Sequence, residues 1–238
     1  MKTDFNNQIS SQSIPNILSS SEELGKALSD YCSLSKSANL TTEQQLRSCV
    51  KVKAYQGDYA VAIALLDQLI ALRPNNAADY NNRGLMHFRN NQFIEAFCDL
   101  SQALEINPSL DSAYNNRANC YAAQGDLVEA IADYDNALDI NPANLRAWIN
   151  QGIAFRELEM YDLALENFDI TLIIGDSLQE RSYAERGRTY HLQGDWNSAV
   201  ADYQIALQIL AGKPDLADYE QKVQTCLNQL LNPVMISN

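Results

Sequence analysis

Small and large apolar residues recur along the chain with a period of about 34 residues. Four segments that open on an aromatic ring begin at Tyr80, Tyr114, Trp148 and Tyr183, which lie 34, 34 and 35 residues apart. Within each period, apolar residues keep the three-to-four-residue spacing of one face of a helix, and they do so in two separate runs. The pattern predicts an all-α chain made of repeated units, each a helix, a tight turn and a second helix.

Small residues hold fixed places in the repeat. Gly or Ala stands at the eighth position of four units, and Ala stands at the twentieth position of all five: Gly84, Ala118, Gly152 and Gly187, then Ala62, Ala96, Ala130, Ala164 and Ala199. Large apolar residues hold the eleventh and twenty-fourth positions in most units, with His87 as an exception at the eleventh. We expect the small residues to be contact points that large apolar side chains face.

Proline and glycine predict where the helices end. Proline closes the first three units and glycine separates the two halves of three units: Pro74, Pro108 and Pro142, then Gly57, Gly125 and Gly194. The predicted repeats cover residues 43–76, 77–110, 111–144, 145–178 and 180–213. A capping helix is predicted at 215–231, an amphipathic helix at 21–36, a disordered tail at 1–20 and a second tail at 232–238.

These residues resemble the tetratricopeptide repeat family, whose 34-residue unit has Trp or Tyr, Leu, Gly, Tyr, Ala, Phe, Ala and Pro at positions 4, 7, 8, 11, 20, 24, 27 and 32. The best unit matches with Tyr114, Ala118, Tyr121, Ala130, Tyr134, Ala137 and Pro142. The resemblance implies a right-handed superhelical solenoid of about five repeats with a C-terminal capping helix. Position 7 departs from the family, because it holds Arg83, Arg117, Gln151 or Arg186. We expect a partly hydrated surface there.

Two units depart further from the family pattern. The first unit is degenerate, so its second helix is better supported than its first. The fourth unit has Asp176 in place of the closing proline and Thr171 in place of an alanine. Its β-branched stretch, residues 170–174, has the composition of a strand, but the phase within the array favours a helix.

The length and composition show that the chain is acidic and long enough to bury a hydrophobic core. It has 238 residues, of which 46% are hydrophobic, and a formal charge of −13. This charge argues against nucleic acid or an anionic membrane as the partner of the whole surface. The sequence has no run of eighteen apolar residues and no secretory leader pattern, so we expect a cytoplasmic protein without a membrane span. The five cysteines are an odd number and have no CxxC spacing, so we expect them to act as small buried hydrophobic residues.

The pattern of chemically active side chains does not predict an enzyme. The two histidines, His87 and His191, are separated by three units, and His87 takes a position at which packing is expected. The sequence has no Gly-rich phosphate loop, nucleophile elbow or HExxH motif. It therefore predicts no catalytic residues, no metal and no cofactor.

Charge is divided between the two helices of each repeat. Positions 1–14 of the five units hold eleven basic and six acidic residues, whereas positions 15–34 hold seventeen acidic and two basic residues. The family resemblance implies that first helices line a concave groove, so the groove should be more basic than the convex back. An acidic or carboxylate-bearing peptide would be attracted there. Charges that merely solvate helix faces would give the same distribution.

The candidate groove residues are amides, arginines and apolar residues of the first helices. Amides would bond to the backbone of a bound segment, arginines to its acids, and apolar side chains would form pockets. The set is Asn81, Asn82, Leu85, Phe88, Asn115, Asn116, Asn119, Arg146, Ile149, Asn150, Ile153, Arg156, Arg181 and Arg188. The asparagines could instead bond to a neighbouring helix.

The resemblance also implies places for a carboxylate clamp, which this chain fills only in part. Asn119, Asn150 and Arg181 match acceptably. Asn115 lacks the charge and Glu185 reverses it. The sequence therefore predicts an incomplete carboxylate clamp.

The sequence as a whole predicts a non-enzymatic adaptor that binds an acidic protein segment in its concave face. One alternative is an assembly factor that binds through convex or end surfaces. Another is a receptor for a small ligand or nucleic acid, but Phe88 and Tyr55 are its only good stacking candidates, which disfavours it. Homodimerisation stays open. So does the hypothesis that residues 13–18, SIPNIL, act as a pseudo-ligand in the chain's own groove.

Overall fold

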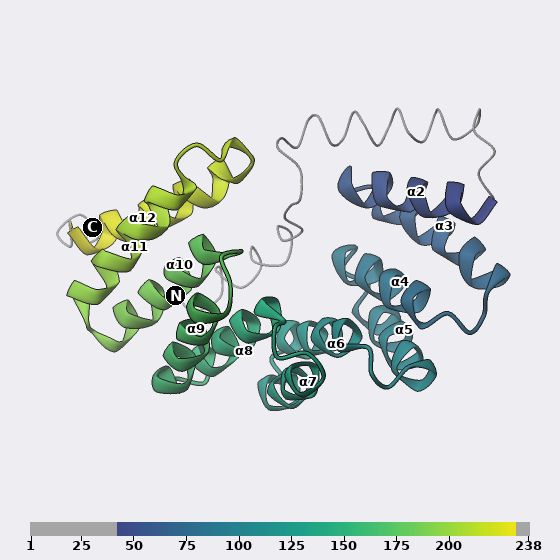
Figure 1. Cartoon of the computed structure of the whole chain (residues 1–238), viewed down its shortest axis with the longest axis horizontal. Coiled ribbons are helices and arrows are strands. Elements are labelled where there is room, and N and C mark those ends of the chain that lie inside the picture. Colours follow the sequence, from purple (N-terminus) through teal and green to yellow (C-terminus); the bar gives the residue numbers. More distant parts are fainter. Residues whose placement is uncertain (1–41, 232–238) are drawn as a thin grey trace. The chain divides into compact units, whose positions relative to one another are not determined.

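The computed structural model describes residues 42–231, and every regular element in this range is a helix. Figure 1 shows these helices in chain order. The all-α fold class is therefore confirmed. The chain divides into two compact units, an N-terminal unit that ends at Gln124 and a C-terminal unit that begins at Gly125. The two predicted tails and the predicted helix at 21–36 lie outside the described residues.

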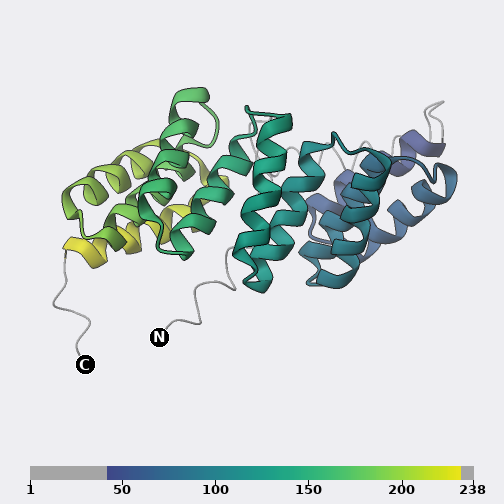
Figure 2. The same cartoon turned by 90° about the horizontal axis from the view of Figure 1, so that it is seen from below.

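The N-terminal unit contains five described helices. They are α2 (Thr42–Tyr55), α3 (Tyr59–Leu72), α4 (Ala77–Arg89), α5 (Phe93–Ile106) and α6 (Asp111–Gln124). Successive helices pack as antiparallel hairpins, as α4 and α5 show in Figures 1 and 2. The first helix of the degenerate unit, α2, forms and packs on α3 through Val50 and Leu66.

The C-terminal unit continues the same succession of helices. It contains α7 (Leu127–Ile140), α8 (Leu145–Glu157), α9 (Tyr161–Ile174), α10 (Gln179–Gln193), α11 (Trp196–Leu210), the 3-10 turn η2 (Pro214–Leu216) and α12 (Ala217–Leu231). The β-branched stretch at 170–174 lies in α9, so phase in the repeat decided correctly for a helix. None of the helices described is long and apolar enough to cross a membrane.

Small residues at the eighth position bring paired helices into contact. A Cβ atom on Gly84 of α4 would stand 2.8 Å from the Leu100 side chain of α5. A Cβ atom on Gly152 of α8 would stand 2.8 Å from the Phe168 ring of α9. Non-bonded atoms essentially never approach a Cβ atom so closely, so a larger residue at either position would force its neighbour to shift. Large residues at the twenty-fourth position therefore pack against small ones, as the sequence predicts.

The turn inside each hairpin uses one left-handed residue. Gly57, Gly125 and Gly194 have φ angles of 75°, 89° and 89°. Asn91 and Glu159 take the equivalent place with φ angles of 59° and 61°. Glycine adopts this conformation without steric cost, and asparagine tolerates it better than glutamate does. The turn geometry is thus common to the repeats even where its preferred residue is missing.

The fourth repeat ends differently from the others. Leu178 has a φ angle of 65° immediately before α10. The hydroxyl of Thr171 donates to the carbonyl of Phe168 at 2.6 Å, and its oxygen lies 2.7 Å from the hydroxyl oxygen of Ser182 on α10. A buried hydroxyl pair thus stands where the family pattern has an apolar alanine.

The last helix covers the apolar end of α11. Val223, Leu227 and Leu230 on α12 are buried in one cluster with Tyr203 and Leu210 of α11. The exposed positions of α12 are mainly polar. This arrangement fits the end cap that a stack of helical hairpins requires.

The cysteines follow the expected role only in part. Cys120 is buried and Cys226 half-buried, whereas Cys98 is exposed. The expectation of small buried hydrophobic residues is therefore wrong for Cys98, because a position on a repeat does not by itself set the burial of its side chain.

Candidate interaction surface

In the N-terminal unit, the seventh residue of α4 links three helices. The Nε and Nη2 atoms of Arg83 donate to the two carboxylate oxygens of Asp99 on α5, at 2.7 and 2.6 Å. The Nη1 atom of Arg83 donates at 2.7 Å to Asp67 on α3, the second helix of the preceding repeat. Bidentate contacts between guanidinium and carboxylate groups are strong and directional. This arginine therefore ties one hairpin to the next.

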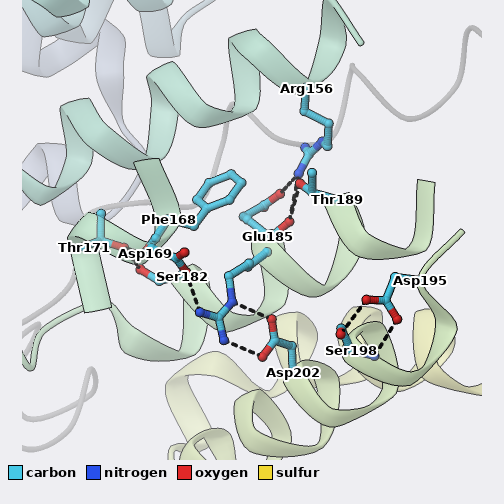
Figure 3. A network of polar contacts seen from close by, with 11 residues as sticks. Arg156, Phe168, Asp169, Thr171, Ser182, Glu185, Thr189, Asp195, Ser198 and Asp202 are labelled. Carbon is cyan, nitrogen blue, oxygen red and sulfur yellow. Dashed lines mark hydrogen bonds and ion pairs between the residues drawn. The ribbon is translucent and has the colours of Figure 1, made fainter. Parts of the chain in front are cut away.

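The C-terminal unit repeats this link. The Nε and Nη2 atoms of Arg186 on α10 donate to Asp202 on α11 at 2.7 and 2.8 Å. The Nη1 atom donates to Asp169 on α9 at 2.6 Å. In Figure 3, Asp169 and Asp202 face the same guanidinium group from two sides. We call this three-helix contact the seventh-position link.

In the repeat before that of Arg186, side-chain amides take the place of the arginine in the seventh-position link. Gln151 on α8 donates to Asp135 on α7 at 2.6 Å and accepts a hydrogen bond from Asn167 on α9 at 2.9 Å. Gln151 is buried, whereas Arg83 and Arg186 are half-buried. The partly hydrated surface expected at this position therefore fits the arginines and is wrong for Gln151. All three side chains belong to the scaffold.

Asparagines on the first helices of the N-terminal unit bond to one another. The Nδ2 atom of Asn116 on α6 donates to Oδ1 of Asn81 on α4 at 3.0 Å, and Nδ2 of Asn115 donates to Oδ1 of Asn116 at 3.3 Å. Asn81 and Asn115 are buried. The structure thus supports the second role considered for these asparagines, a bond to the neighbouring helix.

The other candidate residues of the N-terminal unit are more accessible. Asn82 is exposed, and Asn119, Leu85 and Phe88 are half-buried. The Phe88 ring packs edge to face on Phe93, with ring centroids 5.7 Å apart. These candidate residues carry no charge.

Arginines take the place of amides on the first helices of the C-terminal unit. Arg146 on α8 is exposed, and Arg181 and Arg188 on α10 are half-buried. The Nη2 atom of Arg181 donates to Oδ1 of Asn150 on α8 at 3.1 Å, so the two helices present these side chains together. Ile153 is half-buried one turn after Asn150. We call these five residues the arginine face.

Two candidate residues of the same helix point into the protein. Ile149 is 0% exposed and packs with the Phe168 ring in the core. The Arg156 side chain is also 0% exposed, and its Nη1 atom donates to Oε2 of Glu185 at 2.7 Å. Contrary to expectation, neither residue offers its side chain to a ligand from solvent, because both fill space between α8 and its neighbours.

Glu185 is the carboxylate around which the arginines gather. Burial raises its pKa, but Arg156, Arg181 and Arg188 act in the opposite sense and hold the pKa of this carboxyl below its ordinary value. In Figure 3, Glu185 lies beside Arg156 and Thr189, and the Thr189 hydroxyl donates to the Glu185 carbonyl at 2.9 Å. Three guanidinium groups thus act on one ionised carboxylate.

The histidines make local contacts. The Nδ1 atom of His87 lies 3.0 Å from Oε1 of Gln92. His191 packs against the ring of Trp196, and burial together with the charge of Arg188 lowers the pKa of His191. Within residues 42–231, no three His, Cys, Asp or Glu side chains are grouped as metal ligands.

The acidic partners of the seventh-position links are functional residues of the scaffold that the sequence analysis missed. Asp99 and Asp202 each follow their arginine by sixteen residues, and Asp67 precedes Arg83 by sixteen. This regular spacing is a signal that a search by repeat position could have found. The pair formed by Arg156 and Glu185 has no such recurring signal, because neither residue recurs at its repeat position.

Family comparison agrees with the architecture of paired helices. Models of the tetratricopeptide repeat match residues 50–111 and residues 112–144. Residues 50–144 of the chain are tetratricopeptide repeats. No curated protein matches its sequence.

Solved structures share the fold of this tetratricopeptide repeat protein at low sequence identity. TTC0263, a thermophilic protein with the same repeat from Thermus thermophilus, gives a TM-score of 0.68 at 17% identity over 77% of this chain and 100% of that chain. A crystal structure of MamA gives 0.59 at 19% identity over 74% and 98%. At these identities the likeness concerns the fold alone.

Tetratricopeptide repeats are protein-interaction modules, so this tetratricopeptide repeat protein has proteins or peptides as partners. Proteins of the family are generally scaffolds without catalytic activity. The candidate residues are amides and apolar side chains in the N-terminal unit, whereas those of the C-terminal unit include the arginine face.

Proposed function

We propose that the protein is a non-enzymatic adaptor whose C-terminal unit binds an acidic segment of a cytoplasmic partner on the arginine face. The observation that carries this proposal is the contact of Arg181 with Asn150, which joins α8 and α10 on the side where Arg146 and Arg188 also stand. These arginines lie outside the seventh-position links.

The surrounding charges favour an acidic partner on this face over other faces. The second helices α7, α9 and α11 carry acidic residues, and the chain as a whole has a charge of −13. An acidic segment is therefore repelled from most of the molecule and attracted where arginines gather. Such a contrast steers encounter and selects the docking face more than it raises affinity.

A charge-reversal experiment tests the proposal. The probe is a fluorescent deca-glutamate peptide with both ends blocked, and deca-glutamine is the uncharged control. Arg146→Glu combined with Arg181→Glu is expected to weaken deca-glutamate binding by about tenfold or more in fluorescence anisotropy. The matched control is Lys51→Glu combined with Lys222→Glu, which makes the same change in net charge at exposed positions of α2 and α12. Equal losses in the two double variants would contradict the proposal.

Exposed apolar side chains favour a second candidate, an assembly factor that binds through one edge of the C-terminal unit. Met160, Leu192 and Trp196 are 46%, 53% and 53% exposed. They flank the α8–α9 and α10–α11 turns, and Gln193 donates to Asp162 at 3.3 Å, so these turns lie side by side. Apolar side chains gathered at one exposed place are typical of protein contacts.

In one version of the assembly-factor function, the partner is a second copy of the chain. Sedimentation velocity would then show association that rises with concentration, that Trp196→Ser abolishes, and that reversal of Arg146 and Arg181 leaves intact. A monomer at all concentrations would exclude this version.

A further inference from the structure

One side of α9 exposes a row of large apolar residues. Leu163, Ile173 and Ile174 are 38%, 83% and 44% exposed, and Ile170 is half-buried. Leu163, Ile170 and Ile174 follow one another at spacings of seven and four residues, which places them one above the other on a helix, and Ile173 lies beside them. We call these four residues the α9 stripe.

The α9 stripe takes no part in the packing that holds α9 in place. That packing uses the other side of the helix, where Ala164 and Phe168 are 0% exposed and Thr171 is 1% exposed. Phe168 packs with Ile149 of α8, and the hydroxyl of Thr171 contacts Ser182 of α10. Isoleucine is also a weaker helix former than the polar residues common on helix surfaces. Neither stacking nor helix formation therefore explains the stripe.

The repeat itself does not require apolar residues at these places. Leu163, Ile170 and Ile173 stand at positions 19, 26 and 29 of the fourth repeat. Only α9, among the second helices of the five repeats, has large apolar residues at all three. The same positions hold Glu95, Gln102 and Glu105 on α5, Glu129, Asn136 and Asp139 on α7, and Ser198, Ile205 and Gln208 on α11. Position 30, by contrast, is apolar in every repeat, so Ile174 follows the general pattern.

Acidic residues run along one side of the α9 stripe. Asp162, Glu166 and Asp169 are spaced by four and three residues, so they also share one side of the helix. Asp162 and Glu166 are exposed, and the Asp169 side chain is 49% exposed although it binds Arg186. The exposed surface of α9 thus has an apolar row and an acidic row side by side.

This charge selects among the possible occupants of the face. A second copy that packed α9 against α9 would bring the two acidic rows together, which is unfavourable. An anionic membrane surface is repelled in the same way. The predicted helix at 21–36 carries three acidic and two basic residues, so it does not complement the acidic row either. A basic partner does.

We propose that the α9 stripe and its acidic row dock an amphipathic helix of a partner protein, with large apolar side chains on one face and lysine or arginine beside them. Helices that bind along another helix use apolar anchors at three-, four- and seven-residue spacings, which match the spacing of the stripe. Exposed apolar side chains gathered on one surface are typical of such contacts. This inference goes beyond the proposed function and does not rest on the arginine face.

The test uses a synthetic helix as the probe. It is a dilute, fluorescent fourteen-residue peptide with blocked ends and the sequence LKKLLKLLKKLLKL, which forms one leucine face and one lysine face. The control peptide, LEELLELLEELLEL, has the same apolar face with the opposite charge. Fluorescence anisotropy with the full chain should show binding of the lysine peptide and no binding of the glutamate peptide.

Substitutions on α9 locate the binding face. Ile173→Gln combined with Ile174→Gln should weaken binding of the lysine peptide by about tenfold or more, because two apolar contacts are lost. Ile94→Gln is the matched control, since Ile94 on α5 is 79% exposed and has Glu95 beside it. It should bind the peptide as the unchanged chain does. All three substitutions are at exposed positions, so the thermal midpoint should not fall.

Further variants keep the test decisive if the double substitution disturbs folding. Leu163→Gln, at the other end of the stripe, should also weaken binding. Glu166→Gln should weaken it by about threefold at low salt and by less at high salt. Equal binding by the double variant and the unchanged chain would overturn the inference, as would an equal loss in Ile94→Gln. A self-association of the chain that the double variant abolishes would show that the occupant is a second copy, and the inference would be wrong.

Discussion

The two units of this protein share one scaffold but differ in what their first helices display. The second position of the repeat is Gln44, Ala78 or Ser112 in the N-terminal unit and Arg146 or Arg181 in the C-terminal unit. The packing positions, by contrast, are of the same kind in both units: position 24 is apolar throughout, and position 8 is small except at Val50 of the degenerate first repeat. The comparison teaches that stacking constrains one set of repeat positions and leaves another set free to determine the partner.

The largest expected effect tests whether the cores of the units are equivalent. Phe168→Ala in the C-terminal unit removes a ring that is 0% exposed and should lower the free energy of unfolding by about 3–5 kcal/mol. Leu100→Ala, at the same repeat position of the N-terminal unit, should cost about 2–5 kcal/mol. Urea denaturation measures both. A loss below about 1 kcal/mol in either would show that position 24 does not pack equally in the two units.

A smaller effect tests the seventh-position link. Arg186→Met leaves the buried carboxylate of Asp202 without its fork and should cost about 3 kcal/mol in the free energy of unfolding. Arg83→Met should do the same through Asp99 in the N-terminal unit.

The matched controls for the link are its exposed partners. Asp67 and Asp169 have side chains 56% and 49% exposed, so Asp67→Asn and Asp169→Asn should each cost less than about 1 kcal/mol. Equal costs at the buried and exposed partners would contradict the role assigned to the bidentate contact.

Transplanting charge should make the units more alike. Ala78→Arg combined with Ser112→Arg gives the N-terminal unit the second-position arginines of the C-terminal unit. Deca-glutamate affinity of the full chain should rise by about three- to tenfold, and the gain should shrink as salt is added. Ala78→Gln combined with Ser112→Gln is the uncharged control. A gain that persists at high salt would point to a contact other than charge.

The smallest expected effect concerns the turns. Glu159 has a left-handed φ angle of 61° where three other turns have glycine. Glu159→Gly should therefore raise the free energy of unfolding by about 0.5–1 kcal/mol. Gly194→Ala, at the equivalent turn, should lower it by a similar amount. Thermal denaturation measures both changes. Shifts of opposite sign in the thermal midpoint would confirm that turn geometry, and not side-chain contact, determines the stability effect at these two positions.

Most of the fold is predictable from the sequence because each repeat signals its own local structure. The 34-residue period, the small residues and the turn glycines depend on neighbours within one hairpin, so they can be recognised from the sequence. Even the β-branched end of α9 is assigned correctly, since Ala164 and Phe168 keep their phase. The division into two units at Gln124 cannot be recognised from the sequence, because the repeat pattern continues across it.

The candidate surface is predictable only in part. A helix position indicates which residues face outward, and in the structure two of these candidates, Arg181 and Asn150, lie within hydrogen-bond distance. It does not indicate how deeply a neighbour covers them, so Ile149 and Arg156 are wrong as exposed candidates. The charge difference between first and second helices is a property of the sequence, but several of the arginines that create it are already paired with acids of the second helices.

The sequence by itself determined that this chain forms helical hairpins, where each hairpin turns, and which residues are small enough to let the helices meet. These properties follow from local propensity and periodic spacing. Only the tertiary structure decided which charges meet. Arg186 binds two aspartates, whereas Arg156 binds the carboxylate of Glu185, because the reach of a guanidinium group is only a few ångströms and the helices around it set what lies within that reach.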